Sequence, residues 1–342
     1  MSEAPGLALI EHLRAVFRPD PEHFTALESG FVWWPHQLLQ RVRAEVGRGS
    51  GGLELTRVHA EMLLSQHVEG GGEALAAIAR WNAREIGLSA IRWDAESSAL
   101  SLRSSVYVQG DAWEAPAQRL AHAALLQLSA AERAAEQLLP ELKATPAHSH
   151  AEGGGLRETP DPLLEAWQPY AARGLEPSPW DVPAFRRLST MQPPPWLRVN
   201  LRGHGLDAEL SCSRPGSAEP GSAPGTGVAL LRLIGSQPHP RLGGGLIAAL
   251  QLPPDAEPRP DRLVATAALL NEAESREWNG CDQLGAWCVH PSQGLIFGGF
   301  HPALTFSDDT LERMVWQSAQ RARWAYAFLG TVAKMREGSS TS

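Results

Sequence analysis

Apolar residues recur at helical spacing in several stretches of the chain. Over residues 6–17, Leu9, Leu13 and Phe17 share one helix face, and the prolines that follow end the helix. The same spacing predicts helices over residues 32–46, 73–86, 114–139, 259–276 and 307–336. The helices over 114–139 and 307–336 each carry one stripe of apolar residues at steps of four and three, which is typical of a helix that packs on a sheet.

Other stretches alternate between apolar and polar residues, or are short and apolar, and these predict β-strands. They cover residues 53–58, 61–68, 88–93, 99–108, 196–201, 206–212, 228–234, 246–252, 283–289 and 294–300. Two pairs of them form predicted hairpins, 88–93 with 99–108 and 283–289 with 294–300. Helices and strands in this order indicate the α+β class.

The order of strands, helix, hairpin and long helix occurs twice. Asn82, near the end of one predicted helix, parallels Asn271 in the other. On the hairpins, residues 89–91 parallel 285–287, and residues 100–102 parallel 295–297. Repeated order and spacing indicate a tandem duplication. The alternative is two unrelated α+β domains that share a common order of elements.

The distribution of proline and glycine divides the chain into three parts. Residues 1–139 are the predicted first module with its N-terminal helices, and residues 196–336 are the second module. Residues 140–195 between them are rich in proline and tryptophan and predict a linker with short helices. Residues 213–226 are of low complexity and predict a mobile hairpin loop.

This order of elements, with the small-small-aromatic strand at Gly285, Ala286 and Trp287, resembles the YbjN-like proteins over about two-thirds of the chain. That family shares the fold of type III secretion chaperones. The resemblance implies two tandem YbjN or type III secretion chaperone-like modules, each an antiparallel sheet with helices packed on it. It also implies homodimers that bind partner proteins and have no recognised catalytic centre. Tandem members occur in radiation-resistant bacteria, which raises a role in the DNA-damage response and a single-stranded-DNA-binding protein as partner.

Composition narrows the function. The chain has 342 residues and a formal net charge of −8, from 30 basic and 38 acidic residues, which argues against a broad grip on phosphates. The N-terminal residues lack the basic and apolar regions of a signal peptide, and no apolar run reaches the ~20 residues of a membrane span. We therefore expect a cytoplasmic protein. The three cysteines include no Cys-x-x-Cys pair and are expected to be small core residues.

Motifs for catalysis, cofactors or metals are weak. Residues 241–245 lack the Lys-Ser/Thr of a phosphate-binding loop. His148 and His150 lie in the predicted linker, where a solvated loop is the better interpretation. A second group, which we expect to consist of strand or turn residues, surrounds the second hairpin and comprises Cys281, Cys288, His290 and His301. We therefore predict no catalytic residue, no cofactor and no metal.

Twelve tryptophans are more than a chain of this length usually carries. Those on predicted elements are expected in the core: Trp81, Trp93, Trp287 and Trp316. Those near prolines, loops or a helix start are candidate contacts for a partner, because aromatic residues with a polar handle are favoured at interfaces: Trp33, Trp34, Trp113, Trp167, Trp180 and Trp196. Packing of each within its own domain is the alternative interpretation.

These observations predict a non-catalytic, chaperone-like, protein-binding adaptor that is cytoplasmic and homodimeric. A single-stranded-DNA-binding or DNA-repair protein is the candidate client. The first alternative is an accessory protein that binds single-stranded nucleic acid directly through tryptophan and arginine. The second is an enzyme of unknown class that uses the region from His290 to His301.

Overall fold

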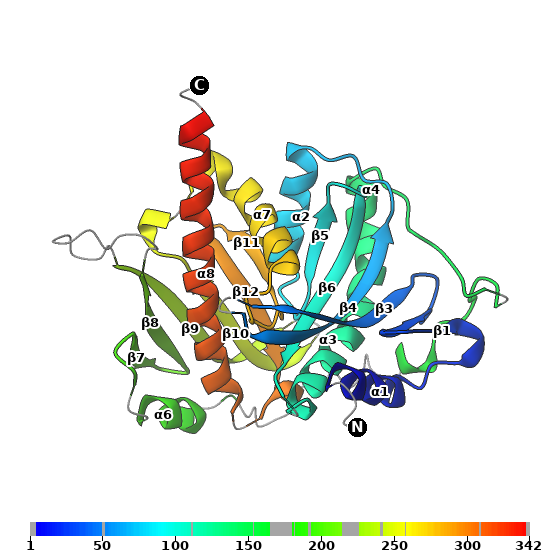
Figure 1. The fold of residues 1–342 in the computed structure, drawn as a ribbon, viewed down its shortest axis with the longest axis horizontal. Helices are drawn as coiled ribbons and strands as arrows, with labels where there is room; N and C mark the ends of the chain where they lie inside the picture. Colours follow the sequence, from blue (N-terminus) through cyan, green and yellow to red (C-terminus); the bar gives the residue numbers. More distant parts are fainter. Residues whose placement is uncertain are drawn as a thin grey trace.

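The computed structural model contains two six-stranded antiparallel sheets, each packed with helices, which confirms the predicted α+β class and its two tandem sheet modules (Figure 1). None of the helices in the described part of the chain is long and apolar enough to cross a membrane. The structure describes residues 5–49, 52–110, 112–152, 154–164, 180, 182–190, 193–213, 226–239, 242–256, 258–307 and 309–339. The predicted loop over 213–226 lies, apart from its end residues, outside this set.

The first module begins with a helix and continues through four strands, a helix, a hairpin and a long helix. In order these are α1 (Pro5–Phe17), β1 (Phe24–Leu27), β2 (Gly30–Trp33), β3 (Gln40–Arg48), β4 (Glu54–Ser65), α2 (Gly72–Arg84), β5 (Ala90–Asp94), β6 (Ala99–Val108) and α3 (Glu114–Arg133). A π-helical turn (Ala134–Leu138) and α4 (Leu139–Glu141) extend α3.

The second module repeats this order. It contains α6 (Val182–Thr190), β7 (Leu197–Arg202), β8 (Gly205–Ser213), β9 (Thr226–His239), β10 (Gly243–Gln251), α7 (Leu263–Arg276), β11 (Ala286–His290), β12 (Gly294–Pro302) and α8 (Thr310–Ser339). The first sheet has the strand order β1-β2-β3-β4-β6-β5, and the second has β7-β8-β9-β10-β12-β11. The two modules therefore have the same topology, strand for strand.

The paired asparagines hold equivalent positions in the two copies. The Asn82 side chain accepts a hydrogen bond from the Ile91 backbone N–H and donates one to its carbonyl, at 2.9 and 3.1 Å. Asn271 makes the same two bonds to Trp287, both at 2.8 Å. Each asparagine thus ties its helix to the first strand of the following hairpin, as the predicted correspondence of 89–91 with 285–287 requires.

Helices cover one face of each sheet. In the first module α1 and α3 pack on β3, β4 and β6, and in the second α6 and α8 pack on β7, β8 and β9. Figure 1 shows α8 crossing the second sheet. The buried apolar residues form one large core in each module. Leu242, Leu284 and Phe300 of the second module join the core of the first, so the two cores meet.

The modules pack against each other reciprocally through α2, α7 and the hairpins. Helix α2 contacts β11 of the other module, and α7 contacts β5 (Figure 1). Ser105 on β6 exchanges two backbone hydrogen bonds with Gln283, at 3.2 and 2.8 Å, and at the equivalent place on β12 the Phe300 N–H donates to the Gly87 carbonyl. Each module thus contributes equivalent elements to the contact, as the two subunits of a symmetric dimer do, but here within one chain.

The segment between α7 and β11 is longer than its counterpart between α2 and β5, and it carries much of this junction. Trp278 packs against Tyr107 with ring centroids 6.1 Å apart and lies under the Arg57 guanidinium. A Cβ atom at position 47 would overlap the Trp278 ring, so Gly47 is the residue that admits this contact.

Two predicted elements are wrong. Residues 32–46, predicted as a helix, form the end of β2 and most of β3, because Gln40 and Val42 are buried while Arg41 and Arg43 are partly exposed, with the period of two that a strand requires. The strands predicted over 53–58 and 61–68 are one strand, β4, since the intervening His59 is itself buried in the sheet.

Much of the segment that follows α4 packs against the first module. The Ala147 N–H donates to the Leu64 carbonyl at 2.8 Å, and the Asp161 N–H donates to the Pro35 carbonyl at 2.7 Å. Arg157 donates to the Trp34 carbonyl and pairs with Asp161 at 3.1 Å. Residues 144–152 and 154–164, which fall within the predicted linker, are thus held on the first sheet and its loops.

We expect Asn82→Ala and Asn271→Ala each to lower the free energy of unfolding by about 2–4 kcal/mol. Each substitution leaves a buried backbone N–H and carbonyl without partners, at about 1–3 kcal/mol per group. Urea unfolding followed by tryptophan fluorescence measures the loss, and Asn200→Ala on the exposed side of β7 is the matched control. Equal midpoints for Asn200→Ala and the two test variants would contradict this role.

Candidate functional site

Two similar sequences in β3 and β4 place charged side chains on one face of the first sheet. Residues 41–45 are Arg-Val-Arg-Ala-Glu and residues 57–61 are Arg-Val-His-Ala-Glu. Their valines and alanines pack into or against the core, so the alternate residues point to the opposite face, which we call the outer face. The antiparallel register sets Arg41 opposite Glu61 and Glu45 opposite Arg57, which pairs opposite charges across the strands.

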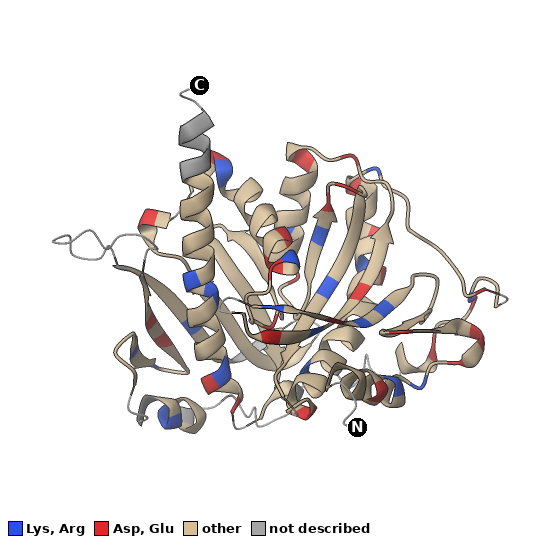
Figure 2. Cartoon of the chain, viewed as in Figure 1, with Lys and Arg blue, Asp and Glu red and all other residues tan. Residues whose placement is uncertain are grey.

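A recess of about 260 Å³ opens on this outer face, across β3, β4, β5 and β6. Four arginines and two carboxylates line it, so positive charge is in excess. Figure 2 shows basic residues on the strands of this sheet, with acidic residues between them. We call it the arginine recess, and its lining residues are Leu39, Arg41, Arg43, Glu61, Leu63, Arg92, Asp94, Ser97, Ala99, Ser101 and Arg103.

Arg103 is the most buried arginine of the recess, with 6% of its surface exposed. Its Nε atom has no hydrogen-bond partner, and no carboxylate of the described residues lies within ion-pair distance of its guanidinium. Burial lowers the pKa of Arg103 to about 10, and the charge of Glu61 opposes this shift. The side chain is therefore still a cation at neutral pH.

His59 lies beside these arginines and is fully buried. The Arg43 Nε–H donates to its Nε2 at 2.9 Å, which places the ring proton on Nδ1. Burial, followed by the charges of Arg103, Arg43 and other arginines, lowers the pKa of His59 well below its usual value. His59 is therefore a neutral acceptor that orients Arg43 and adds no positive charge.

Glu45 balances the arginines at one end of the outer face. It pairs with Arg57 at 2.8 Å and with Arg43 at 2.9 Å. Burial raises the pKa of Glu45, but the hydrogen bond and charge of Arg57 outweigh it, and the net pKa is below the usual value. Arg57 thus interacts with Glu45 and with the Trp278 ring, whose centroid lies 4.6 Å from the guanidinium carbon of Arg57.

Helix α7 of the second module contacts two of the residues that line the recess. The Arg92 guanidinium donates to the Ser275 hydroxyl at 2.8 Å and to Asp94 at 3.2 Å. Arg276 pairs with Asp94 at 3.5 Å. The recess therefore exists in this form only while the two modules are packed together.

The equivalent face of the second sheet lacks most of these charges, although Arg41 corresponds to Arg232, which pairs with Asp207 at 3.8 Å. The strand registers align Arg43, His59, Glu61, Arg92 and Arg103 with Ile234, Ile247, Ala249, Cys288 and Gly298. Ala83 of α2 packs against Ala249 and Cys288, in a small apolar cluster. Toward β8, Val228 and Ile234 are 47% and 39% exposed. At these five positions the first copy is thus charged or polar and the second is apolar, while the part of the second face on β7, β8 and β9 keeps the ion pairs of Asp207 with Arg202 and Arg232.

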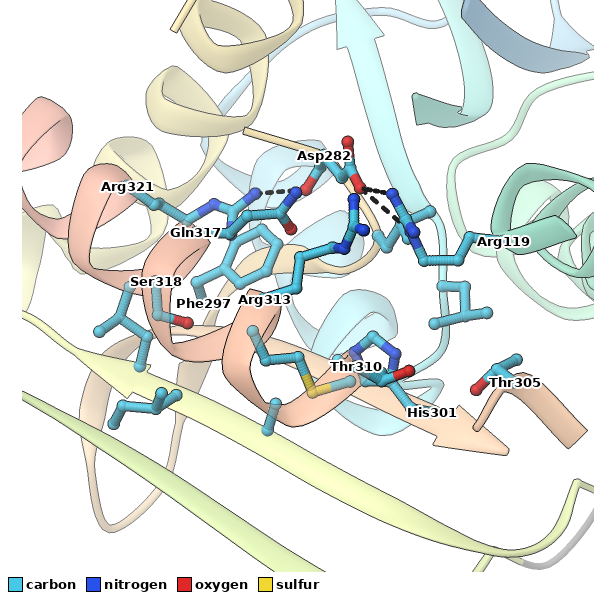
Figure 3. A pocket seen from close by; sticks show the side chains of 17 residues that line it. Arg119, Asp282, Phe297, His301, Thr305, Thr310, Arg313, Gln317, Ser318 and Arg321 are labelled. Atoms are coloured by element: carbon cyan, nitrogen blue, oxygen red, sulfur yellow. Dashed lines mark hydrogen bonds and ion pairs between the residues drawn. The ribbon is translucent and has the colours of Figure 1, made fainter. Parts of the chain in front are cut away.

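A smaller cavity of about 40 Å³ lies at the junction of the modules, between α3, α8 and β12 (Figure 3). Asp282 accepts two hydrogen bonds from Arg119, at 2.7 and 3.2 Å, and its carbonyl accepts one from Arg321 at 2.6 Å. Arg321 also pairs with the fully buried Glu274 at 2.7 Å. The volume is close to that of one water molecule, roughly 30 Å³, and the cations that surround it are paired, which fits a structural junction.

Of the residues around the second hairpin, His301, Cys281 and Cys288 are buried in or near this junction, whereas His290 is partly exposed at the turn between β11 and β12. Burial and the charges of Arg119 and Arg321 lower the pKa of His301 to about 3, too low for a general base at neutral pH. Burial raises the pKa values of Cys281 and Cys288 to about 12, so both thiols stay protonated. Among the described residues, no three His, Cys, Asp or Glu side chains gather as a metal site requires.

The candidate contact tryptophans are dispersed over the molecule. Trp33 and Trp180 are fully buried, and Trp34, which is 8% exposed, donates to the Ser149 hydroxyl at 3.0 Å. Trp113 is half-buried beside the His12 ring. Trp167 lies outside the described residues. The side chains of Trp33 and Trp180 therefore fill cores.

Trp196 is half-buried and belongs to an aromatic cluster on α8. Its ring lies 4.7 Å from that of Trp316 and 4.9 Å from the Arg323 guanidinium. Trp316 was expected in the core but is 49% exposed, because α8 turns this residue away from the sheet. Trp81 and Trp287, also expected in the core, are buried there, and Trp93 is partly buried.

The residues of the arginine recess were not found from the sequence, although a signal was present. Arg41, Arg43 and Glu45 repeat at a period of two, as do Arg57, His59 and Glu61. On the helix predicted over residues 32–46, the first set does not lie on one face. Its similarity to the second set was therefore not recognised. Two strands with charges at alternate positions would have predicted one charged sheet face.

We expect Asp282→Ala to weaken the junction and lower the free energy of unfolding by about 3–5 kcal/mol, the usual cost of breaking a buried ion pair. The change leaves Arg119 without its carboxylate and the Tyr107 N–H without its acceptor. Urea unfolding measures the loss, with Asp261→Ala at an exposed site as the control. A loss no larger than that of the control would show that Asp282 does not hold the modules together.

Comparisons with protein-family models, with curated proteins and with solved structures give no match for this chain. The similarity to YbjN-like proteins therefore stays a prediction from the order of elements.

Proposed function

We propose that the chain is a non-catalytic, chaperone-like adaptor that binds an acidic segment of a protein client on the outer face of the first sheet. The observation that carries the proposal is the arginine recess, a local excess of positive charge on a chain whose net charge is −8. Such a local excess favours a partner of opposite charge and speeds its association.

The distribution of charge favours a protein client over single-stranded nucleic acid. Glu45, Glu61 and Asp94 interrupt the arginines on the outer face, so no continuous cationic track follows the strands. A nucleic-acid backbone gains its affinity from many phosphates neutralised in a row. A peptide segment has separated carboxylates and can avoid the acidic positions.

Exposed apolar side chains on the outer face of the second sheet support a client with mixed character. The exposed Val228 and Ile234 lie on the face that corresponds to the arginine recess. Apolar area contributes affinity while paired charges contribute specificity. An adaptor with a cationic recess on one sheet and exposed apolar side chains on the other suits a client segment with both kinds of residue. A single-stranded-DNA-binding or DNA-repair protein is the candidate client that the predicted family resemblance supplies.

We expect Arg41→Glu to weaken binding of a fluorescein-labelled, aspartate-rich decapeptide about tenfold or more, a change of about 1.4 kcal/mol or more. Arg41 is partly exposed at the recess, and the reversed charge repels the peptide. Fluorescence anisotropy at two salt concentrations gives the dissociation constants.

The control is Arg198→Glu, which makes the same charge change at a side chain that is 84% exposed on β7. Equal affinity of the two variants would remove the proposed site. A thymidine decanucleotide that binds more tightly than the peptide, and loses affinity in Arg41→Glu but not in Arg198→Glu, would replace the adaptor by a protein that binds single-stranded nucleic acid.

A further inference from the structure

The floor of the arginine recess contains a buried cation without a counter-ion. Arg103 is 6% exposed, and among the described residues its guanidinium has neither a carboxylate within ion-pair distance nor a partner for Nε. Nε of Arg92 is also buried without a partner. Buried charges are normally paired, and a buried unsatisfied group at the base of a recess points to a missing ligand.

The nearest acidic residue does not satisfy Arg103. Glu61 is its cross-strand neighbour on β4, yet the Glu61 carboxylate accepts a hydrogen bond from the Ser101 hydroxyl at 2.7 Å and faces Arg41 on its other side. Asp94 pairs with Arg92 and Arg276. The two carboxylates of the recess are thus shared among several cations, and positive charge is left over at Arg103.

The fold does not require an arginine at this position. The equivalent residue on β12 is Gly298, and the second sheet forms with the same strand order and register. An arginine kept at a buried site where the duplicate has no side chain is therefore explained by binding better than by packing.

We infer that the floor of the arginine recess is a preformed subsite for one carboxylate group, with Arg103 as the main binding residue and Arg92 beside it. The planar guanidinium matches a carboxylate with two parallel hydrogen bonds. The recess volume of about 260 Å³ accommodates one acidic side chain with a few waters, at roughly 30 Å³ per water. The inference rests on the proposed function only for the source of the carboxylate, an aspartate or glutamate of the client.

Anion-dependent thermal stability of the full chain tests this subsite. The probe is N-acetyl-glutamate amide, which carries a single side-chain carboxylate, and the comparison probes are inorganic phosphate and chloride at equal ionic strength. We expect the probe to raise the midpoint of the wild-type chain by about 2–4 °C once it is well above its dissociation constant. We expect no such rise in Arg103→Met, and Arg198→Met is the control that keeps the response.

Arg103→Met has a second expected effect. Without any probe, its midpoint should be equal to or above that of the wild type, because the apolar side chain removes an unpaired buried charge. A lower midpoint together with an unchanged response to the probe would overturn the inference, since Arg103 would then be a packing residue.

Proton–nitrogen spectra of the arginine Nε–H groups keep the test independent of whether the variant folds. In the wild-type chain, the probe should shift the Arg103 resonance, while an exposed arginine such as Arg198 should not respond. Unmoved Arg103 signals would refute the subsite. A response to phosphate that exceeds the response to the carboxylate would overturn the carboxylate assignment. Equal peptide affinity of Arg41→Glu and Arg198→Glu would remove the proposed client site without altering the response of Arg103 to the probe, so the two proposals fail separately.

Discussion

The backbone pairing of Ser105 with Gln283 is the contact on which the rest of the molecule depends. It joins β6 to the segment before β11, and Asp282 beside it accepts hydrogen bonds from the Tyr107 N–H and from Arg119. With this segment fixed, α7 lies on β5 and brings Ser275 to Arg92. All residues that line the arginine recess come from the first module, and the second module helps to hold Arg92 and Asp94 in place.

Duplication explains how the two outer faces could diverge. The contact of Ser275 with Arg92 has an apolar counterpart, in which Ile86 of the first module lies near Gly298 of the second. Both arrangements keep the same backbone geometry, because the Asn82 and Asn271 ties fix each hairpin to its helix. Within one chain, side chains on one face can change while the other copy maintains the packing.

The sequence predicted the repeat better than the surface. Both hairpins, the middle helices and the correspondence of Asn82 with Asn271 followed from period and spacing, which depend on local interactions. The helix assigned to residues 32–46 was wrong, because apolar residues in a short strand also fall near helical positions. The recess was missed for the same reason, since its charges come together only when β3, β4, β5 and β6 are aligned. The exposure of Trp316 depends on the rotation of α8 about its own axis. The apolar stripe of α8 does not determine the exposure of every residue on the helix.

Two of the buried arginines, Arg321 and Arg103, show why one site is structural and the other is a candidate for binding. Arg321 is 3% exposed and has Glu274 and the Asp282 carbonyl as partners, so its charge is satisfied within the fold. Arg103 is buried to nearly the same degree without such partners. Because desolvating a cation costs the same whatever its later use, the difference lies in the counter-charge. At Arg321 the chain supplies a carboxylate, and the arginine joins the two modules. At Arg103 the chain supplies none, and the acidic group of the proposed client completes the pair.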